Sequence, residues 1–208
     1  LKKKPGYVLA ILGATGAVGK ETLEILEERK FPLASLRLFA SKRSAGGVMS
    51  CQGQEWKVEE LTPESSFAGV DFALISATDA ISRDYGQRLG AAGIVVIDDS
   101  GVFRMDQDVP LVEPEVNVQA LAAMPRGIVS IPNCTTTPLV MASASEFWSL
   151  GTHASWSSKS FSSSWVASQD EGSQGPFRRE QARYGKAVAD VVCEATHRDP
   201  CSLSLAAL

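Results

Sequence analysis

Histidine is scarce in this sequence, and its cysteines are few and scattered. Two histidines and four cysteines occur among 208 residues, and no two cysteines form a C-x-x-C pair. A structural zinc site needs four closely grouped Cys or His ligands, so the composition argues against a metal-binding module. We expect the cysteines to be reduced, and the ordinary interpretation of each is a small apolar residue.

Excess positive charge and long apolar runs are also missing. The formal net charge is −4 and the sequence pI is about 5.3, which argues against nucleic acid or an anionic membrane as a partner. No apolar run reaches the ~18 residues of a membrane span. Glycines within residues 13–19 interrupt any secretory leader after the first lysines. We therefore expect a cytoplasmic protein.

The sequence does contain an alternation of apolar strands and amphipathic helices over residues 5–142. Helical spacing of apolar residues follows the first apolar run, and residues 81–92 predict another helix. Repetition of strand and helix implies right-handed crossovers. We predict an α/β fold, a Rossmann-type doubly wound parallel sheet with helices on both faces. Its expected strands lie at residues 7–12, 36–40, 56–58, 70–76, 94–97 and 128–131.

The composition changes after about Met141. Residues 143–208 begin with a stretch rich in serine that also contains Trp148, Trp156 and Trp165. Serine-rich composition is typical of a linker, but linkers seldom contain several tryptophans. We expect this segment to be an irregular or aberrant tail, and no chemistry is predicted in it.

A glycine-rich turn joins the first predicted strand to the first predicted helix. Its sequence is Gly13-Ala14-Thr15-Gly16-Ala17-Val18-Gly19. Glycines allow close approach of the backbone to a pyrophosphate, and the helix N-terminus offers N–H groups and a positive dipole end. The spacing is G-x-x-G-x-x-G, and a plain turn is the alternative. The strand before it and the helix after it favour a dinucleotide site.

Cations and hydroxyls follow the second predicted strand, in Ser41-Lys42-Arg43-Ser44. An NAD site usually has an acid at this position, which binds the ribose 2′-hydroxyl. Here no acid is present, and arginine can bind a 2′-phosphate with two hydrogen bonds. A solvated basic loop is the alternative interpretation. The position after the second strand favours NADP as the cofactor.

Cys134 lies between a predicted strand and an apolar segment that begins with Pro138. Proline is favoured in the first turn of a helix, so Cys134 is predicted at or just before a helix N-terminus. The positive end of the helix dipole favours a thiolate there. A thiolate can attack a carbonyl carbon while nearby N–H groups stabilise the oxyanion. A buried structural cysteine remains the alternative from the residues alone.

Five segments occur in the order found in aspartate-semialdehyde dehydrogenases, and the chain resembles this family over roughly residues 5–142. They are the glycine-rich turn, Arg43-Ser44-Ala45-Gly46, Val102-Phe103-Arg104-Met105, Val112-Glu113-Pro114-Glu115-Val116-Asn117 and Pro132-Asn133-Cys134-Thr135-Thr136. The resemblance implies NADP-dependent interconversion of aspartyl phosphate and aspartate semialdehyde through a cysteine thioester. This reaction belongs to lysine, threonine, methionine and diaminopimelate biosynthesis.

The resemblance also implies roles for individual residues. Cys134 corresponds to the acylated nucleophile, Asn133 lies beside the thioester, and Arg104 holds phosphate. A solvated structural arginine is the alternative for Arg104. The implied cofactor-binding residues are Gly13, Thr15, Gly16, Ala17, Val18, Ser41, Arg43 and Ser44.

Two departures from the family pattern are present. Asp99-Ser100-Gly101-Val102 stands where the family commonly has Asn-Ser-Ser-Ala. Beyond Met141 there is no counterpart of the family's substrate and dimerisation domain, with its glutamine, substrate arginine and general-base histidine. We assign no role to His153 or His197. The hypothesis is a reading-frame disruption just after residue 142, which predicts an inactive chain without the family's usual homo-oligomer.

Two other functions compete with this interpretation. N-acetyl-glutamyl-phosphate reductases share the thioester chemistry, but they usually have glycine before the cysteine and tyrosine after it. Asn133 and Thr135 therefore favour the aspartate enzyme. The other alternative is a non-catalytic NADP-binding module that combines the first domain with a new tail.

Overall fold

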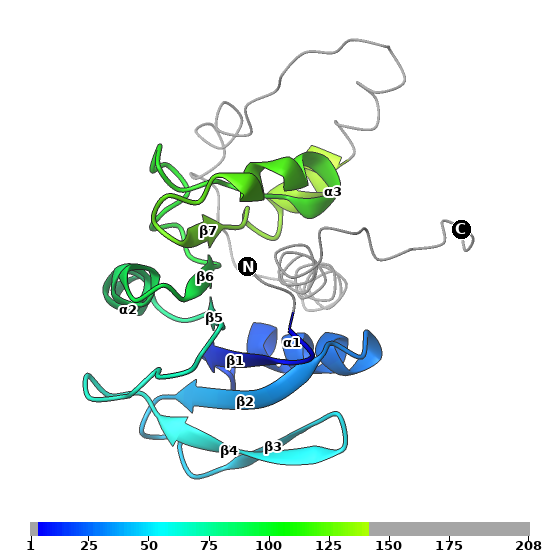
Figure 1. Cartoon of the computed structure of the whole chain (residues 1–208), viewed down its shortest axis with the longest axis vertical. Coiled ribbons are helices and arrows are strands. Elements are labelled where there is room, and N and C mark those ends of the chain that lie inside the picture. The colour runs from blue at the N-terminus through cyan, green and yellow to red at the C-terminus, as the bar shows by residue number, and fades with distance from the viewer. Residues whose placement is uncertain (1–3, 142–208) are drawn as a thin grey trace.

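Seven strands form one sheet in the structure, a computed structural model that describes residues 4–141 (Figure 1). The strand order is β3-β4-β2-β1-β5-β6-β7, and every neighbouring pair is parallel except β3 and β4. The strands are β1 (Tyr7–Leu12), β2 (Leu33–Ala40), β3 (Val48–Cys51), β4 (Gln54–Glu60), β5 (Phe72–Ile75), β6 (Val95–Asp98) and β7 (Ile128–Ser130).

Helices cover both faces of this sheet, as the sequence predicted. Figure 1 shows α2 (Asp79–Ala91) on one face, with α1 (Ala17–Glu28) and α3 (Pro114–Asn117) on the other. A short 3₁₀ helix, η1 (Val118–Ala122), follows α3 directly. The strand order and the helices on both faces confirm the predicted Rossmann-type fold.

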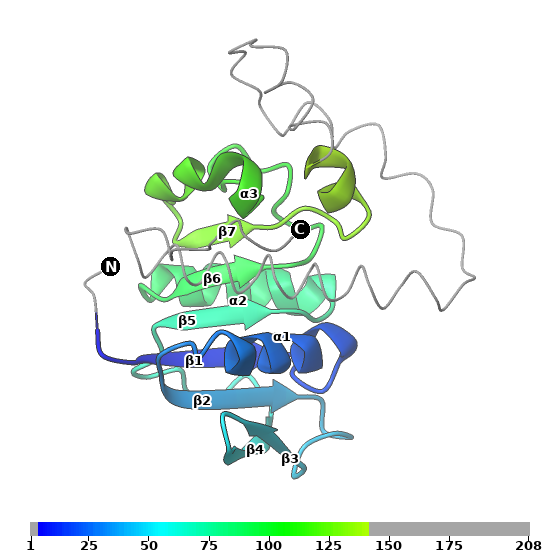
Figure 2. The same ribbon diagram turned by 90° about the vertical axis from the view of Figure 1, so that its right-hand side faces the viewer.

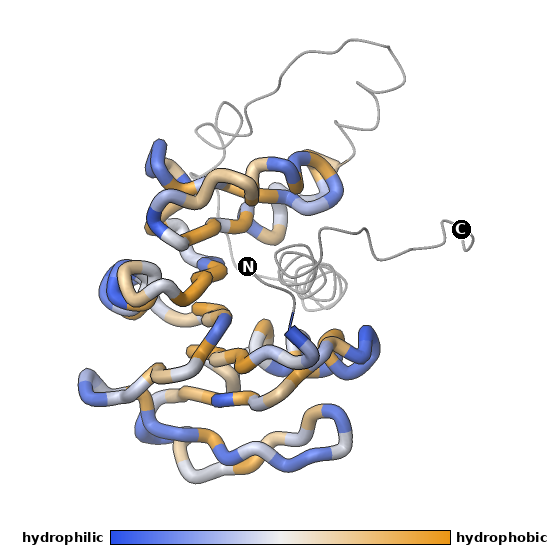
Figure 3. The backbone as a smooth tube through the Cα atoms, in the orientation of Figure 1, coloured by the Kyte–Doolittle hydropathy of each residue, from blue (hydrophilic) through white to orange (hydrophobic). Residues whose placement is uncertain are grey.

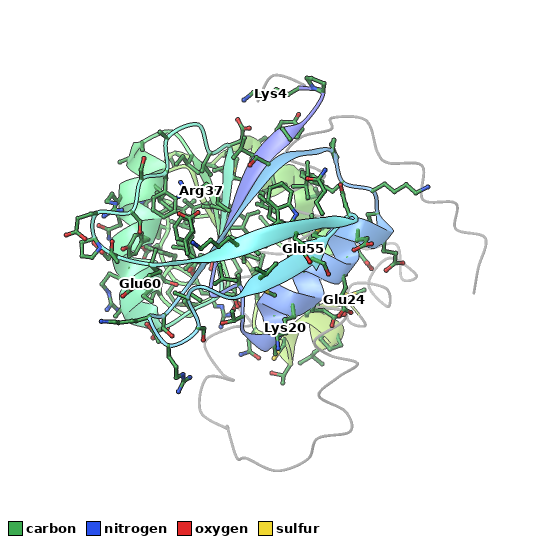
Figure 4. All side chains as sticks on the ribbon, turned by 90° about the horizontal axis from the view of Figure 1, so that it is seen from below. Lys4, Lys20, Glu24, Arg37, Glu55 and Glu60 are labelled. Atoms are coloured by element: carbon green, nitrogen blue, oxygen red, sulfur yellow. The ribbon has the colours of Figure 1, made fainter. Side chains whose placement is uncertain are left out.

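The core consists of two apolar layers, one on each face of the sheet. Alternation along β1 divides its residues, because Leu9 and Ile11 pack on the α1 side while Ala10 and Leu12 pack on the α2 side. The apolar residues gather along the strands in Figure 3. Lys20 and Glu24 are exposed on the outer side of α1 (Figure 4). This pattern explains why the strands read as continuous apolar runs and the helices as amphipathic ones.

The strand β3 was not predicted, and it makes the sheet mixed at one edge. It pairs antiparallel with β4 through a two-residue turn at Gln52 and Gly53, whose φ angles are 53° and 71°. Two consecutive positive φ angles match the twist of a tight hairpin. The Gln52 side-chain amide donates hydrogen bonds to the carbonyls of Leu26 at 3.1 Å and Phe31 at 2.8 Å. These two bonds tie the hairpin to the end of α1 and offset the strain of a non-glycine residue.

The predicted tail, residues 143–208, lies outside the described residues. Within residues 4–141 there is no helix long and apolar enough to cross a membrane. The same residues contain no group of three or more His, Cys, Asp or Glu side chains placed to hold a metal ion.

Candidate active site

Every sequence-predicted site residue follows the carboxyl end of a parallel strand, and these strands end on the same side of the sheet (Figure 2). The glycine-rich turn follows β1, Ser41–Ser44 follow β2, Arg104 lies in the loop after β6, and Cys134 follows β7. Ligand sites of open α/β sheets lie outside the carboxyl ends of the strands. The topology therefore places the predicted residues in one row along this side.

The glycine-rich turn depends on two close backbone approaches. Gly13 has a φ of 93°, and a Cβ atom there would lie 1.9 Å from the carbonyl oxygen of Ser76 at the end of β5. A Cβ atom on Gly19 would lie 2.5 Å from the carbonyl oxygen of Ala14. No side chain fits at either position, so these glycines set how closely β1, β5 and α1 approach each other.

The N-terminus of α1 is open to an anion. Gly16 is the N-cap residue and supplies no capping side chain, and the first turn of α1 contains no acidic residue. Gly16 and Ala17 are exposed, while Thr15 and Val18 are partly exposed. The first N–H groups of a helix have no intrahelical partner, and the helix dipole favours negative charge here. The turn can therefore accept a phosphate.

A cationic turn follows β2, the strand adjacent to β1. The N–H groups of Ser44 and Ala45 donate to the carbonyl of Ser41 at 2.8 and 3.0 Å. Ser41, Lys42 and Arg43 are exposed and Ser44 is partly exposed, and within residues 4–141 Arg43 forms no ion pair. The turn therefore presents positive charge to solvent beside the open N-terminus of α1.

Cys134 lies two residues before the helical residues 136–141 and is partly buried. The carbonyl of Asn133 accepts the N–H groups of Thr136 at 2.8 Å and Thr137 at 3.0 Å. The Asn133 side-chain oxygen accepts the N–H of Thr135 at 2.9 Å and the Thr135 hydroxyl at 2.7 Å, and it lies 3.6 Å from Cys134 Sγ. Asn133 therefore caps the helix start and orients the residue that follows it.

Arg104 is joined to the segment that leads into Cys134. Its Nε donates to the Ile131 carbonyl at 3.0 Å, and its Nη2 donates to the Asp99 carbonyl at 2.6 Å. Both acceptors are uncharged, and Arg104 has no ion pair with any described residue. The guanidinium group is partly buried, and its bond to Ile131 holds this positive charge beside the segment that leads into Cys134. Such a group suits a tetrahedral oxyanion.

The site residues fall into two groups along the sheet. Cys134, Asn133 and Arg104 gather at the end of β7, and the two cofactor turns gather at the ends of β1 and β2. Three strand spacings separate β1 from β7, a span of roughly 14 Å. Val18 and Cys134 nevertheless pack against the same apolar layer on the α1 side of the sheet. A ligand that links the two groups has to extend across the ends of β5 and β6.

Sequence reasoning missed Asp98, the last residue of β6. Its carboxyl group is fully buried, and burial raises the pKa of Asp98, against the opposing effects of Ser82, Ser100 and Arg104. Asp98 and Asp99 are adjacent charged residues at the end of an apolar strand, and nothing local distinguishes them. Asp99 faces Ser76, whose hydroxyl donates to its carboxylate at 2.7 Å.

Comparison with known proteins agrees with this geometry. Residues 8–124 match the semialdehyde dehydrogenase, NAD binding domain. The aspartate-semialdehyde dehydrogenase of Aquifex aeolicus is 47% identical over 138 residues, which are 66% of this chain and 41% of the relative. That of Bacillus subtilis is 45% identical over 137 residues, 66% of this chain and 39% of the relative. The chain thus spans about two fifths of the length of these curated relatives.

Solved structures give the same result. Aspartate semialdehyde dehydrogenase II of Vibrio cholerae, complexed with ASA, has a TM-score of 0.66 and 40% identity over 68% of this chain and 46% of its own. The enzyme of Candida albicans, solved with NADP, has a TM-score of 0.59 and 26% identity over 71% of this chain and 48% of its own. The chain belongs to the semialdehyde dehydrogenase family, and residues 8–124 are its NAD-binding domain.

Proposed function

We propose that residues 5–142 are the NADP-binding, nucleophile-bearing part of an aspartate-semialdehyde dehydrogenase. The observation that carries this proposal is the attachment of Arg104 to the Ile131 carbonyl, three residues before Cys134. It places a positive charge, which forms no ion pair within residues 4–141, beside the segment that leads to a thiol at a helix start. Similarity to aspartate-semialdehyde dehydrogenases over two thirds of the chain supports the same substrate class.

Cys134 is the proposed nucleophile. Its sulfur attacks the acyl carbon of aspartyl phosphate, the acyl–oxygen bond breaks, and phosphate leaves toward Arg104 with the bonding electrons. Asn133 orients the thiol and caps the helix whose N–H groups face the reacting carbonyl. The resulting thioester is then reduced to the aldehyde. NADPH, when bound, supplies the hydride for this step.

The described residues fit NADP. The open start of α1 accepts a pyrophosphate, with Gly13, Thr15, Gly16, Ala17 and Val18 in the turn. A 2′-phosphate would meet Arg43, Ser44 and Ser41 after β2, in a turn whose own residues include no acid. A dinucleotide extending across β5 and β6 would span the roughly 14 Å from the turn to Cys134. The Candida albicans relative was solved with NADP.

Titration of NADP and NAD against the wild-type chain and an Arg43→Ala variant tests the cofactor. We expect tighter binding of NADP, and a loss of about 1.5–3 kcal/mol in the variant, because a charge-assisted contact is removed. NAD affinity should change little. Arg83→Ala, an exposed arginine on α2, is the matched control. Equal wild-type affinities for the two nucleotides, or an Arg43→Ala variant with unchanged NADP affinity, would contradict the proposal.

We further propose that the tail from residue 143 arose by a reading-frame disruption and supplies none of the family's remaining active-site groups. Its serine- and tryptophan-rich composition and the missing glutamine, arginine and histidine motifs support this proposal. Translation of the coding DNA beyond residue 142 in the other two frames tests it. If neither frame restores those motifs, the disruption hypothesis is wrong, and a non-catalytic NADP-binding module becomes the better interpretation.

A further inference from the structure

A buried carboxyl group lies behind the proposed phosphate site and has no part in the reaction described above. Asp98 ends β6 on the α2 side of the sheet, with an exposed fraction of 0%. Two buried serines flank it, Ser82 on α2 and Ser130, its register partner on β7. The Asp98 Oδ1 atom and both serine hydroxyls make no hydrogen bond of normal length with the described residues. Burying a carboxyl group with one oxygen outside normal hydrogen-bond length is costly.

The other carboxyl oxygen of Asp98 accepts the first of a series of hydrogen bonds along the loop that leads to Arg104, and this series is called the relay below. Ser100 Oγ donates to Asp98 Oδ2 at 2.7 Å, and the same hydroxyl accepts the N–H of Val102 at 3.1 Å. Two residues later, Arg104 donates back to the carbonyl of Asp99 at 2.6 Å. The buried Asp98 Oδ2 atom is therefore one of the points that hold the loop from Asp98 to Arg104 on the sheet, beside the bonds of Asp99 to Ile75 and Ser76 and of Arg104 to Ile131.

The charged groups around Asp98 are few. Arg104 attracts its negative charge and Asp99 repels it. The facing residues on α2 and β7, Ser82 and Ser130, are neutral. Asp99 has the larger of the two charge effects. A negative charge on Asp98 also acts on Arg104, where it offsets part of the positive field that Arg104 presents to a ligand.

We propose that Asp98 is a positioning residue for the anion site at Arg104: through Ser100 it holds the loop that carries the guanidinium, and its charge state sets how strongly that site binds an oxyanion. The inference rests on the proposed function in one respect, that Arg104 binds a tetrahedral anion. Asp98 itself touches neither substrate nor the reacting atoms.

Sulfate is the probe, since it is a tetrahedral dianion whose charge stays constant between pH 4 and 8. Titration of the full ¹⁵N-labelled chain is followed at the Arg104 Nε–Hε resonance, assigned with an Arg104→Lys variant. Ser100→Ala keeps the carboxylate but breaks the relay, and we expect roughly 10-fold weaker binding, the scale of one hydrogen bond to a charged group. Asp98→Asn keeps an acceptor oxygen for Ser100, so binding at pH 7 should be at least as tight as in the wild type. Ser50→Ala, an exposed serine on β3, is the control.

The pH profile separates positioning from simple structural support. Wild-type affinity should rise as the pH falls through the pKa of Asp98, which burial raises, because a neutral Asp98 no longer offsets the charge of Arg104. The Asp98→Asn variant should lack this rise. Unchanged affinity in Ser100→Ala, or the same pH profile in Asp98→Asn and wild type, overturns the role of Asp98. No Arg104 response to sulfate in the wild type overturns the anion site itself, and both proposals with it.

Discussion

The two described cysteines differ in their surroundings. Cys51 is fully buried in β3, with its Sγ donating to the Leu23 carbonyl at 3.6 Å. Burial, and then the nearby charge of Glu27, raise the pKa of the Cys51 thiol. Cys134 is partly exposed beside a helix N-terminus, where the helix dipole favours a thiolate. The greater exposure of Cys134 and its place before a helix therefore favour it over Cys51 as the proposed nucleophile.

Brief alkylation of the native chain with iodoacetamide tests this difference. We expect Cys134 to be modified faster than Cys51, by about 10-fold or more, because both exposure and thiolate fraction favour it. Mass spectrometry of tryptic peptides ranks the sites, and denatured protein provides the reference in which the two should react alike. Faster native modification of Cys51 would contradict the assignment of Cys134. Cys193 and Cys201 lie outside the described residues and are not part of the comparison.

At the scale of elements, the turn between β1 and α1 requires glycine at position 13 for two reasons: its backbone conformation, and the lack of space for a Cβ atom. Gly13 and Gly93 both have positive φ angles, 93° and 83°. A Cβ atom at Gly13 would overlap the Ser76 carbonyl, whereas a Cβ atom at Gly93, after α2, would meet nothing within 4 Å. The pair therefore separates the strain of a left-handed conformation from the cost of overpacking.

Alanine at these two positions should give different losses of stability. Gly93→Ala should lower the free energy of unfolding by ~1–2 kcal/mol, the cost of left-handed strain. Gly13→Ala adds an overpacking cost of ~1–3 kcal/mol, and it should also abolish dinucleotide binding because the turn must move. Urea unfolding of both variants measures the difference. Equal losses would show that the approach of β1 to β5 is not close.

At the scale of the whole molecule, Asp98 makes folding depend on pH. Its pKa in the folded state is raised, so between the ordinary value near ~3.9 and the raised value the folded state binds more protons than the unfolded state. The contribution of this group to stability is therefore complete below the unfolded pKa and is lost as the pH rises through the folded pKa. Asp98→Asn removes the titration but keeps an acceptor oxygen.

The free energy of unfolding of wild type minus that of Asp98→Asn should therefore fall as the pH rises from 4 to 7. Urea titrations of both proteins at each pH give this difference, and the other carboxyl groups cancel in it. A difference that stays constant with pH, or one that grows, would show that Asp98 titrates as an ordinary exposed carboxyl.

Activity also belongs to the whole molecule, and we expect little or none from the 208-residue chain. General acid–base assistance is typically worth ~10²–10⁴ in rate, and the family's base and substrate arginine have no recognised counterpart in residues 143–208. Phosphate-dependent reduction of NADP with aspartate semialdehyde is the assay, beside a Cys134→Ala variant. Robust turnover that disappears in this variant would show that the tail supplies both groups.

Local sequence was enough for the features that depend on neighbouring residues. An apolar run, a glycine-rich turn and an amphipathic helix follow one another from Tyr7 to Glu28, and together they predict a dinucleotide-binding unit. The helix start after Cys134 was also predicted from local sequence, since a strand, an asparagine and a proline mark it. The strand β3 was missed because it is only four residues long and is stabilised by Gln52, whose partners lie on α1 and after it.

The sequence by itself determined the fold class and predicted the nucleotide turn, because each depends on residues within about one helix or strand of one another. Cys134 as the nucleophile stays a prediction, which the resemblance to aspartate-semialdehyde dehydrogenases implies. Tertiary structure alone decided that Arg104 is held by the Ile131 carbonyl 27 positions away, and that Asp98 is buried while Asp99 is not. Burial and long-range hydrogen bonds arise only when β5, β6, β7 and α2 pack together. The charge at the proposed phosphate site is therefore set by packing, since the same two aspartates in an extended chain would be equivalent.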